Sequence, residues 1–143
     1  MKNFAILRVQ SVTLPSEVVY GQTIYRGVDE FTHRMAKQLH SSLIESGVEC
    51  GDVQRSYKPE GSGFYSVGTT GRYFVSVGIE RKVLPEVEVN IIAEPRRGAV
   101  RSWDKFEPLL KQAIAHTFPL STPIWMTEDE FIESKPGISK EIG

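Results

Sequence analysis

Apolar side chains recur every four residues between Val28 and Ser46. They fall at positions i, i+4, i+8 and i+12, which places them on one stripe of an α-helix. The stripe consists of Phe31, Met35, Leu39 and Leu43. Polar and charged residues of the segment fall mainly outside it. The pattern predicts an amphipathic helix, and Gly47 is well placed to end it because glycine readily adopts the left-handed conformation that closes many helices.

A different pattern, in which apolar and polar positions alternate, follows this helix. The alternation is clearest over residues 72–80 and 86–94. Strands that pair an apolar face with a polar one suit an antiparallel sheet with one buried and one wet face. Shorter β-prone runs at 53–58 and 64–67 predict two more strands, and the apolar run at 4–14 predicts a strand before the helix.

Helical spacing returns over residues 103–118. Its apolar positions are Trp103, Phe106, Leu109, Leu110, Ala113, Ile114 and Phe118. Pro108 lies near the start, so either the first turn is irregular or the regular helix begins near this proline. Beyond it, residues 123–126 form either a short strand or an extended arm. The sequence Thr127-Glu128-Asp129-Glu130 is a capping-box pattern that predicts a final short helix.

The order of these elements predicts an α+β fold. We expect an antiparallel β-meander with two main helices packed on one face, followed by a short C-terminal strand and helix. Residues 1–133 are expected to form a single domain and residues 134–143 a flexible tail. The β-prone runs at 18–20 and 23–25 are compatible with either a small hairpin or an ordered loop.

Composition excludes several classes of function. The formal net charge of −1 over 143 residues creates no global field that attracts nucleic acid or an anionic membrane. The single cysteine, Cys50, cannot form an internal disulfide, which fits a reducing compartment. The N-terminal apolar run stops at Arg8, and no apolar run approaches the roughly 20 residues that span a membrane. We therefore expect a cytoplasmic protein with no membrane association.

The residue types that carry catalysis are dispersed. His33 and His40 would lie about 10 Å apart along one predicted helix, too far to share a metal ion, and His116 belongs to the other helix. The His-x-Ser shape of residues 40–42 has no matching partner motif. Nothing in the spacing activates Cys50 as a nucleophile. We predict no catalytic residue, no metal site and no cofactor, and an enzyme with a dispersed site around His33 or His116 stays as an alternative.

Two surfaces remain as candidates for binding. The first combines Trp125 with the acidic residues Glu128, Asp129, Glu130 and Glu133, and it suits a basic protein partner. Those acids also favour the dipole of a short helix, and Trp125 is equally compatible with a buried anchor. The second surface is basic and suits nucleic acid or nucleotides. It consists of Arg72, Arg81, Lys82, Arg96 and Arg97.

The order of elements also resembles a known class of proteins. The apolar helix that ends at Gly47, the β-meander, the second helix and the segment Pro123-Ile124-Trp125 are together similar to small bacterial immunity-type proteins. The resemblance covers roughly residues 28–132. It implies a non-enzymatic α+β domain that neutralises a partner toxin.

Our leading hypothesis is a small non-catalytic protein that inhibits a partner protein, such as a toxin or effector, by stoichiometric contact. One alternative is nucleic-acid or nucleotide binding through the basic surface. Another is inhibition of a host defence by a phage- or plasmid-encoded protein. An exposed edge strand at residues 86–94 could pair two copies into a homodimer, and an ordinary covered edge is equally compatible with the sequence.

Overall fold

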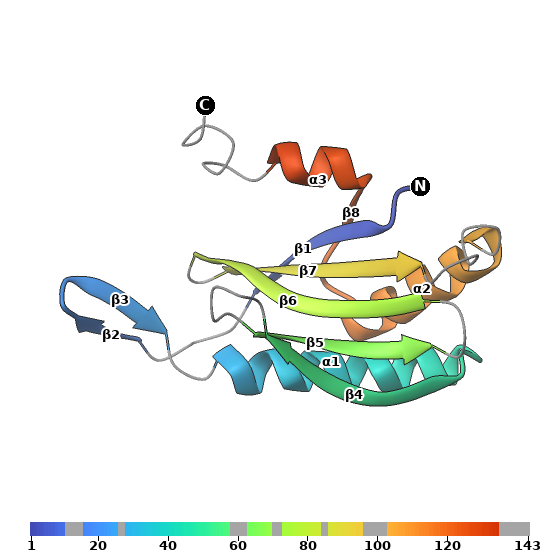
Figure 1. The fold of residues 1–143 in the computed structure, drawn as a ribbon, viewed down its shortest axis with the longest axis horizontal. Helices are drawn as coiled ribbons and strands as arrows, with labels where there is room; N and C mark the ends of the chain where they lie inside the picture. Colours follow the sequence, from blue (N-terminus) through green and yellow to red (C-terminus); the bar gives the residue numbers. More distant parts are fainter. Residues whose placement is uncertain are drawn as a thin grey trace.

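The centre of the protein is a six-stranded antiparallel sheet with strand order β4-β5-β6-β7-β1-β8. The computed structural model describes residues 1–10, 16–25, 28–57, 63–69, 73–83, 86–95 and 103–134. The strands are β1 (Phe4–Gln10), β4 (Cys50–Tyr57), β5 (Gly63–Thr69), β6 (Tyr73–Val83), β7 (Glu86–Pro95) and β8 (Ile124–Met126). Strands β4 to β7 follow one another as the predicted meander (Figure 1).

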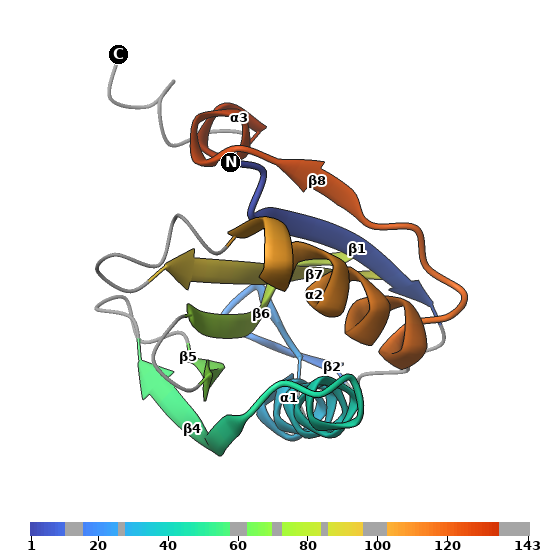
Figure 2. The same ribbon diagram turned by 90° about the vertical axis from the view of Figure 1, so that its right-hand side faces the viewer.

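Helices α1 (Val28–Glu45) and α2 (Trp103–Thr117) lie side by side on one face of the sheet (Figure 2). The predicted α+β class, with two main helices on one face, is confirmed. The hydroxyl oxygens of Ser42 on α1 and Thr117 on α2 are 2.9 Å apart, within hydrogen-bond distance. A third, short helix, α3 (Glu128–Ser134), follows β8 at the end of the sheet.

The core lies between the sheet and these two helices, and the alternation along the strands supplies it. On β6, Val75 and Val77 point inward and are fully buried. Phe74, next to Val75 on the same strand, points outward and is partly exposed. The apolar stripe of α1 packs against these buried valines. Its members Leu39 and Leu43 have no exposed surface. In β6 and α1 the predicted core face is therefore the face that the fold buries.

Helix α1 ends in a Schellman motif, as the position of Gly47 predicts. The Val48 amide donates to the Leu43 carbonyl and the Gly47 amide donates to the Ile44 carbonyl, each at 3.0 Å. Gly47 has a φ of 92°, in the region that glycine adopts without a steric penalty. Val48 then packs against the core, so the turn directs the chain into β4.

Helix α2 begins at Trp103, with Pro108 inside it, so the alternative in which the helix begins near Pro108 is wrong. Aromatic contacts hold this first part of the helix to the sheet. The ring of Tyr73 on β6 stacks on Phe106 at a centroid distance of 4.4 Å and meets Trp103 edge-on at 5.6 Å. These contacts occupy both aromatic side chains at the start of α2.

The expectation that residues 86–94 could form an edge is wrong. Strand β7 is paired with β1 on one side and β6 on the other, so its backbone groups are used by both neighbours. The edges are β4 and β8. The register of β4 shifts between Cys50 and Val53, and β8 is only three residues long. Bulges and short edge strands both discourage pairing between sheets.

The open question over residues 18–25 is settled in favour of a hairpin. Strands β2 (Ser16–Val19) and β3 (Gln22–Tyr25) form a separate two-stranded sheet. The two residues that connect them, Tyr20 and Gly21, have φ values of 50° and 78°, as a type I′ turn requires. A left-handed conformation costs a non-glycine residue about 1–2 kcal/mol. The hairpin projects from the main sheet in Figure 1.

The flexible tail predicted at residues 134–143 lies outside the described residues, except for Ser134, which ends α3. Within the part of the chain that the structure describes, no helix combines the length and the apolar composition needed to cross a membrane.

The position of Leu39 gives a first test of the fold. Leu39→Ala removes a fully buried side chain from the layer between α1 and the sheet. We expect it to lower the free energy of unfolding by about 2–5 kcal/mol, because it removes apolar contacts and leaves a cavity. The measurement is chemical denaturation followed by circular dichroism. Ile44→Ala, on the same helix but half exposed, is the control, with an expected loss below about 1 kcal/mol. Equal losses for the two variants would contradict this packing.

Candidate functional site

Strand β8 and helix α3 form one corner of the molecule, which we call the β8–α3 corner. In the pairing of β8 with β1, Trp125 is opposite Ala5 and Met126 is opposite Phe4. Directly opposite residues share a face of the sheet. Trp125 therefore lies on the helix-covered face together with Ala5. Ile124 and Met126 lie on the outer face.

Trp125 is half buried and packs against the core. The ammonium Nζ of Lys111, on α2, lies 5.3 Å from the centroid of the tryptophan rings, within the range of a cation–π contact. The same Nζ is 3.0 Å from Glu107 Oε1. The tryptophan thus fastens the edge strand to α2, which supports its interpretation as an anchor. Its role in partner binding stays a prediction.

Helix α3 is attached to the outer side of the sheet. Its Phe131 is buried, and its ring lies 4.8 Å from the ring of Phe4, centroid to centroid. Phe4 is opposite Met126 and so belongs to the outer face. The structure therefore separates the predicted acidic surface from Trp125. The acids belong to a helix packed on the outer face, whereas the tryptophan points towards α2.

The predicted capping box is confirmed at the start of α3. The Thr127 amide donates to Glu130 Oε1 at 3.1 Å, and the Glu130 amide donates to Thr127 Oγ1 at 3.2 Å. Two donors of Thr127, first its backbone amide and then its side-chain hydroxyl, stabilise the Glu130 carboxylate, and together with the weaker positive charge of Lys2 they hold the pKa of Glu130 below its ordinary value. This pair fixes the first turn of a helix only seven residues long.

The acidic side chains of α3 are open to solvent. Glu128, Asp129, Glu130 and Glu133 are all exposed. Two apolar side chains of the same corner are also exposed: Ile124 by 58% and Ile132 by 54%. Sequence reasoning missed both isoleucines. The signal for Ile124 was its place next to Trp125 in a predicted strand, where adjacent residues face opposite sides.

The basic surface predicted for nucleic acid lies mostly outside the described residues. Arg72, Arg96 and Arg97 fall there. The backbones of Arg81 and Lys82 belong to β6, where they pair with Glu88 and Val87 after a shift in register. Arg81 is thus placed opposite an acidic residue of the neighbouring strand.

The outer face of the sheet mixes charges of both signs. Arg8 on β1 is opposite Glu88 on β7, and both belong to this face. Phe74, 40% exposed, is opposite the exposed Glu94. In both pairs the residue on β7 is an acid. Among the described residues, this face therefore has no excess of positive charge that would attract a phosphate backbone.

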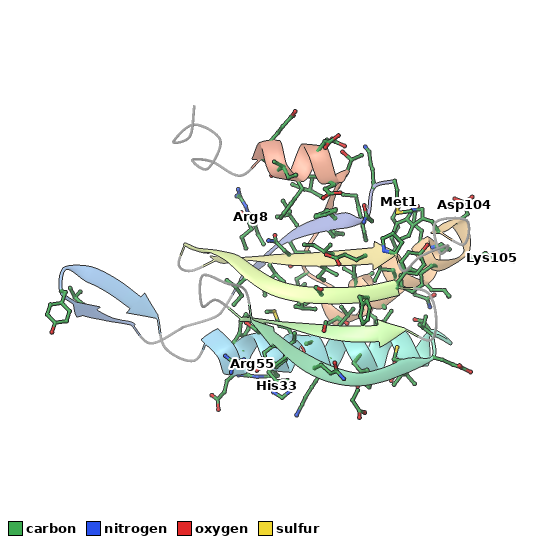
Figure 3. All side chains as sticks on the ribbon, in the orientation of Figure 1. Met1, Arg8, His33, Arg55, Asp104 and Lys105 are labelled. Carbon is green, nitrogen blue, oxygen red and sulfur yellow. The ribbon has the colours of Figure 1, made fainter. Side chains whose placement is uncertain are left out.

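The three histidines take part in separate structural contacts. The ring of His33 on α1 stacks on Tyr65 of β5 at a centroid distance of 4.5 Å, and Tyr65 is opposite Arg55 of β4; Figure 3 labels His33 and Arg55. His40 Nε2 lies 2.9 Å from the Gly51 carbonyl, to which it can donate. His116 Nε2 is 3.6 Å from Glu45 Oε2 and joins the ends of α2 and α1. The three rings thus fasten α1 to β5, to β4 and to α2.

Cys50 is the first residue of β4 and is partly buried. Its Sγ lies 3.6 Å from the Val48 carbonyl, and burial raises the pKa of its thiol. A raised pKa leaves less of the reactive thiolate near neutral pH. Within the described residues, no group of three or more histidine, cysteine, aspartate or glutamate side chains is placed to hold a metal ion.

Comparisons with known protein families, with curated proteins and with solved structures find no match to this chain.

The capping box predicts how the β8–α3 corner responds to pH. Because the folded pKa of Glu130 is lowered, its contribution to stability is complete above the ordinary pKa of 4.5 and is lost as pH falls through the lower folded value. We expect the amide proton of Thr127, followed by NMR, to shift upfield with a midpoint below the ordinary pKa of glutamate. Glu130→Gln keeps the capping geometry without the charge and should abolish this transition. A midpoint at or above the ordinary glutamate value would contradict the two hydrogen bonds.

Proposed function

We propose that this chain is a small cytoplasmic binding protein that inhibits a partner protein by stoichiometric contact, of the immunity or inhibitor type. The observation that carries the proposal is the β8–α3 corner. It presents four exposed acids and the exposed Ile132 on a helix that is fixed at its start and at its centre, together with the exposed Ile124 of β8. Such a surface suits a partner whose contact region is basic and has an apolar centre.

The rigidity of the corner supports this proposal. A short isolated helix is marginal in water, but Phe131 packs on Phe4 and the capping box closes the first turn. The acids are therefore presented in a defined arrangement before any partner arrives. Preorganisation reduces the entropy lost on binding, and exposed charge of one sign speeds the encounter with an oppositely charged surface.

The contacts of the histidines also support a non-catalytic role. His33 is stacked on a buried tyrosine and His40 reaches a backbone carbonyl, so both rings serve to join α1 to the sheet. These contacts account for the positions of His33 and His40 without a catalytic role.

The proposal is tested by reversing charge on α3. The double variant Asp129→Lys with Glu133→Lys changes two exposed acids and leaves the capping residue Glu130 intact. We expect its affinity for the protein that co-purifies with the wild-type chain to fall about tenfold or more at low salt, mainly through slower association. The difference should shrink as salt increases. Surface plasmon resonance measures both rates.

The matched control is Glu30→Lys with Asp52→Lys. It makes the same change in charge at exposed positions of α1 and β4. Equal losses for the two double variants would mean that net charge, and not the β8–α3 corner, governs binding. Failure of any protein to co-purify in stoichiometric amount would overturn the proposed function itself.

A further inference from the structure

The β2–β3 hairpin presents large apolar side chains to solvent. Val18 is 73% exposed, and Tyr20 at the tip is fully exposed. The two strands are hydrogen-bonded to each other in a sheet separate from the main one, and the hairpin projects beyond the body of the domain (Figure 1). A two-stranded hairpin alone is marginally stable in water. Packing against the core of the protein therefore does not explain the exposed side chains of Val18 and Tyr20.

The choice of residue at the tip opposes local stability. The first central position of a type I′ turn requires a positive φ and favours asparagine, aspartate or glycine. Here it holds Tyr20 at a φ of 50°, with its ring in solvent. Aromatic residues are disfavoured in this conformation. An unfavourable local conformation that no contact within the fold compensates is expected mainly at functional sites.

The charge of the hairpin indicates what it contacts. Residues 16–25 contain one charged residue, Glu17, and neither lysine nor arginine. A nucleic-acid arm needs cations to displace counterions from phosphate, and attachment to anionic lipid likewise depends on basic residues. Tyrosine, in contrast, is enriched among the residues that dominate protein–protein binding energies, because its ring fills a pocket at a small entropic cost. The chemistry favours an uncharged, apolar pocket on a protein.

We propose that the β2–β3 hairpin is a contact arm whose tip residue, Tyr20, enters an apolar pocket of the partner protein. This inference rests on the proposed function, since it requires a protein partner, but it places a second contact away from the β8–α3 corner. The arm supplies apolar specificity, and the acids of α3 supply electrostatic attraction.

The variant Tyr20→Asn tests the contribution of the Tyr20 side chain to binding without disturbing the fold of the hairpin. Because Tyr20→Asn introduces a residue that the turn prefers, it should keep the hairpin intact, as checked by the cross-strand amide contacts of Val18 and Thr23 in NMR spectra. We expect it to weaken binding of the co-purified partner about 30-fold, as for a central aromatic contact. Tyr20→Phe keeps the ring and should change affinity less than about threefold. Leu120→Asn, at another fully exposed apolar position, is the control and should have no effect.

Site-specific cross-linking in the producing cell then locates the contact. A photoreactive benzoylphenylalanine replaces Tyr20 in one variant and Ile132 of α3 in a second. Cross-links from position 20 to the same protein that co-purifies, together with loss of its binding by Tyr20→Asn, support the arm. Cross-links from position 132 alone, with full binding by Tyr20→Asn, overturn the arm and leave the proposed function standing.

Three other outcomes also overturn the inference. Cross-links from position 20 to a second copy of this chain would make the arm a self-association element. Flotation of the wild-type chain, but not of Tyr20→Asn, with vesicles of phosphatidylcholine and phosphatidylglycerol would make it a lipid contact. No cross-link from either position would overturn the arm and the proposed function together.

Discussion

The apolar layer between the main sheet and helices α1 and α2 holds the rest of the structure in position. Inward side chains of β1, β6 and β7 meet the stripe of α1 and the buried positions of α2 there, and most of them have no exposed surface. The layer exists because two periodicities agree. Alternation places every second strand residue on one face, and the four-residue spacing places the helical residues against it. Burying this surface offsets the entropy lost when the chain becomes ordered.

The two candidate contact surfaces depend on this layer in different ways. The β8–α3 corner is attached to both faces of the sheet: Trp125 packs against this layer towards α2, and Phe131 packs on Phe4 on the outer face. Its acids therefore have a fixed framework. The β2–β3 hairpin lies outside the layer and is held by its own ladder and turn. A surface of the first kind suits electrostatic steering, and one of the second kind suits insertion into a pocket.

The remaining polar groups serve mainly to join elements. His33 and His40 fasten α1 to β5 and β4, and the hydroxyls of Ser42 and Thr117 meet where the two helices touch. The edges of the sheet are limited by a shift in register in β4 and by the shortness of β8. Both edges are therefore poorly suited to pairing with a further strand.

Local sequence determined much of this protein. The stripe of α1, the Gly47 terminus, the alternation of β6 and β7 and the capping box of α3 each follow from interactions within a few residues, and each is found as predicted. Which strands and helices become neighbours was decided only by the tertiary structure. Strand β1 inserts between β7 and β8, which turns an expected edge into an inner strand, because pairing partners far apart in the chain are chosen by the packing of the whole sheet. The same pairing separates Trp125 from the acids of α3. Adjacent positions of a strand face opposite sides, so Trp125 lies on the helix-covered face while α3 packs through Phe131 on Phe4 of the outer face. The exposure of Tyr20 likewise became visible only once the hairpin was seen to stand apart from the core.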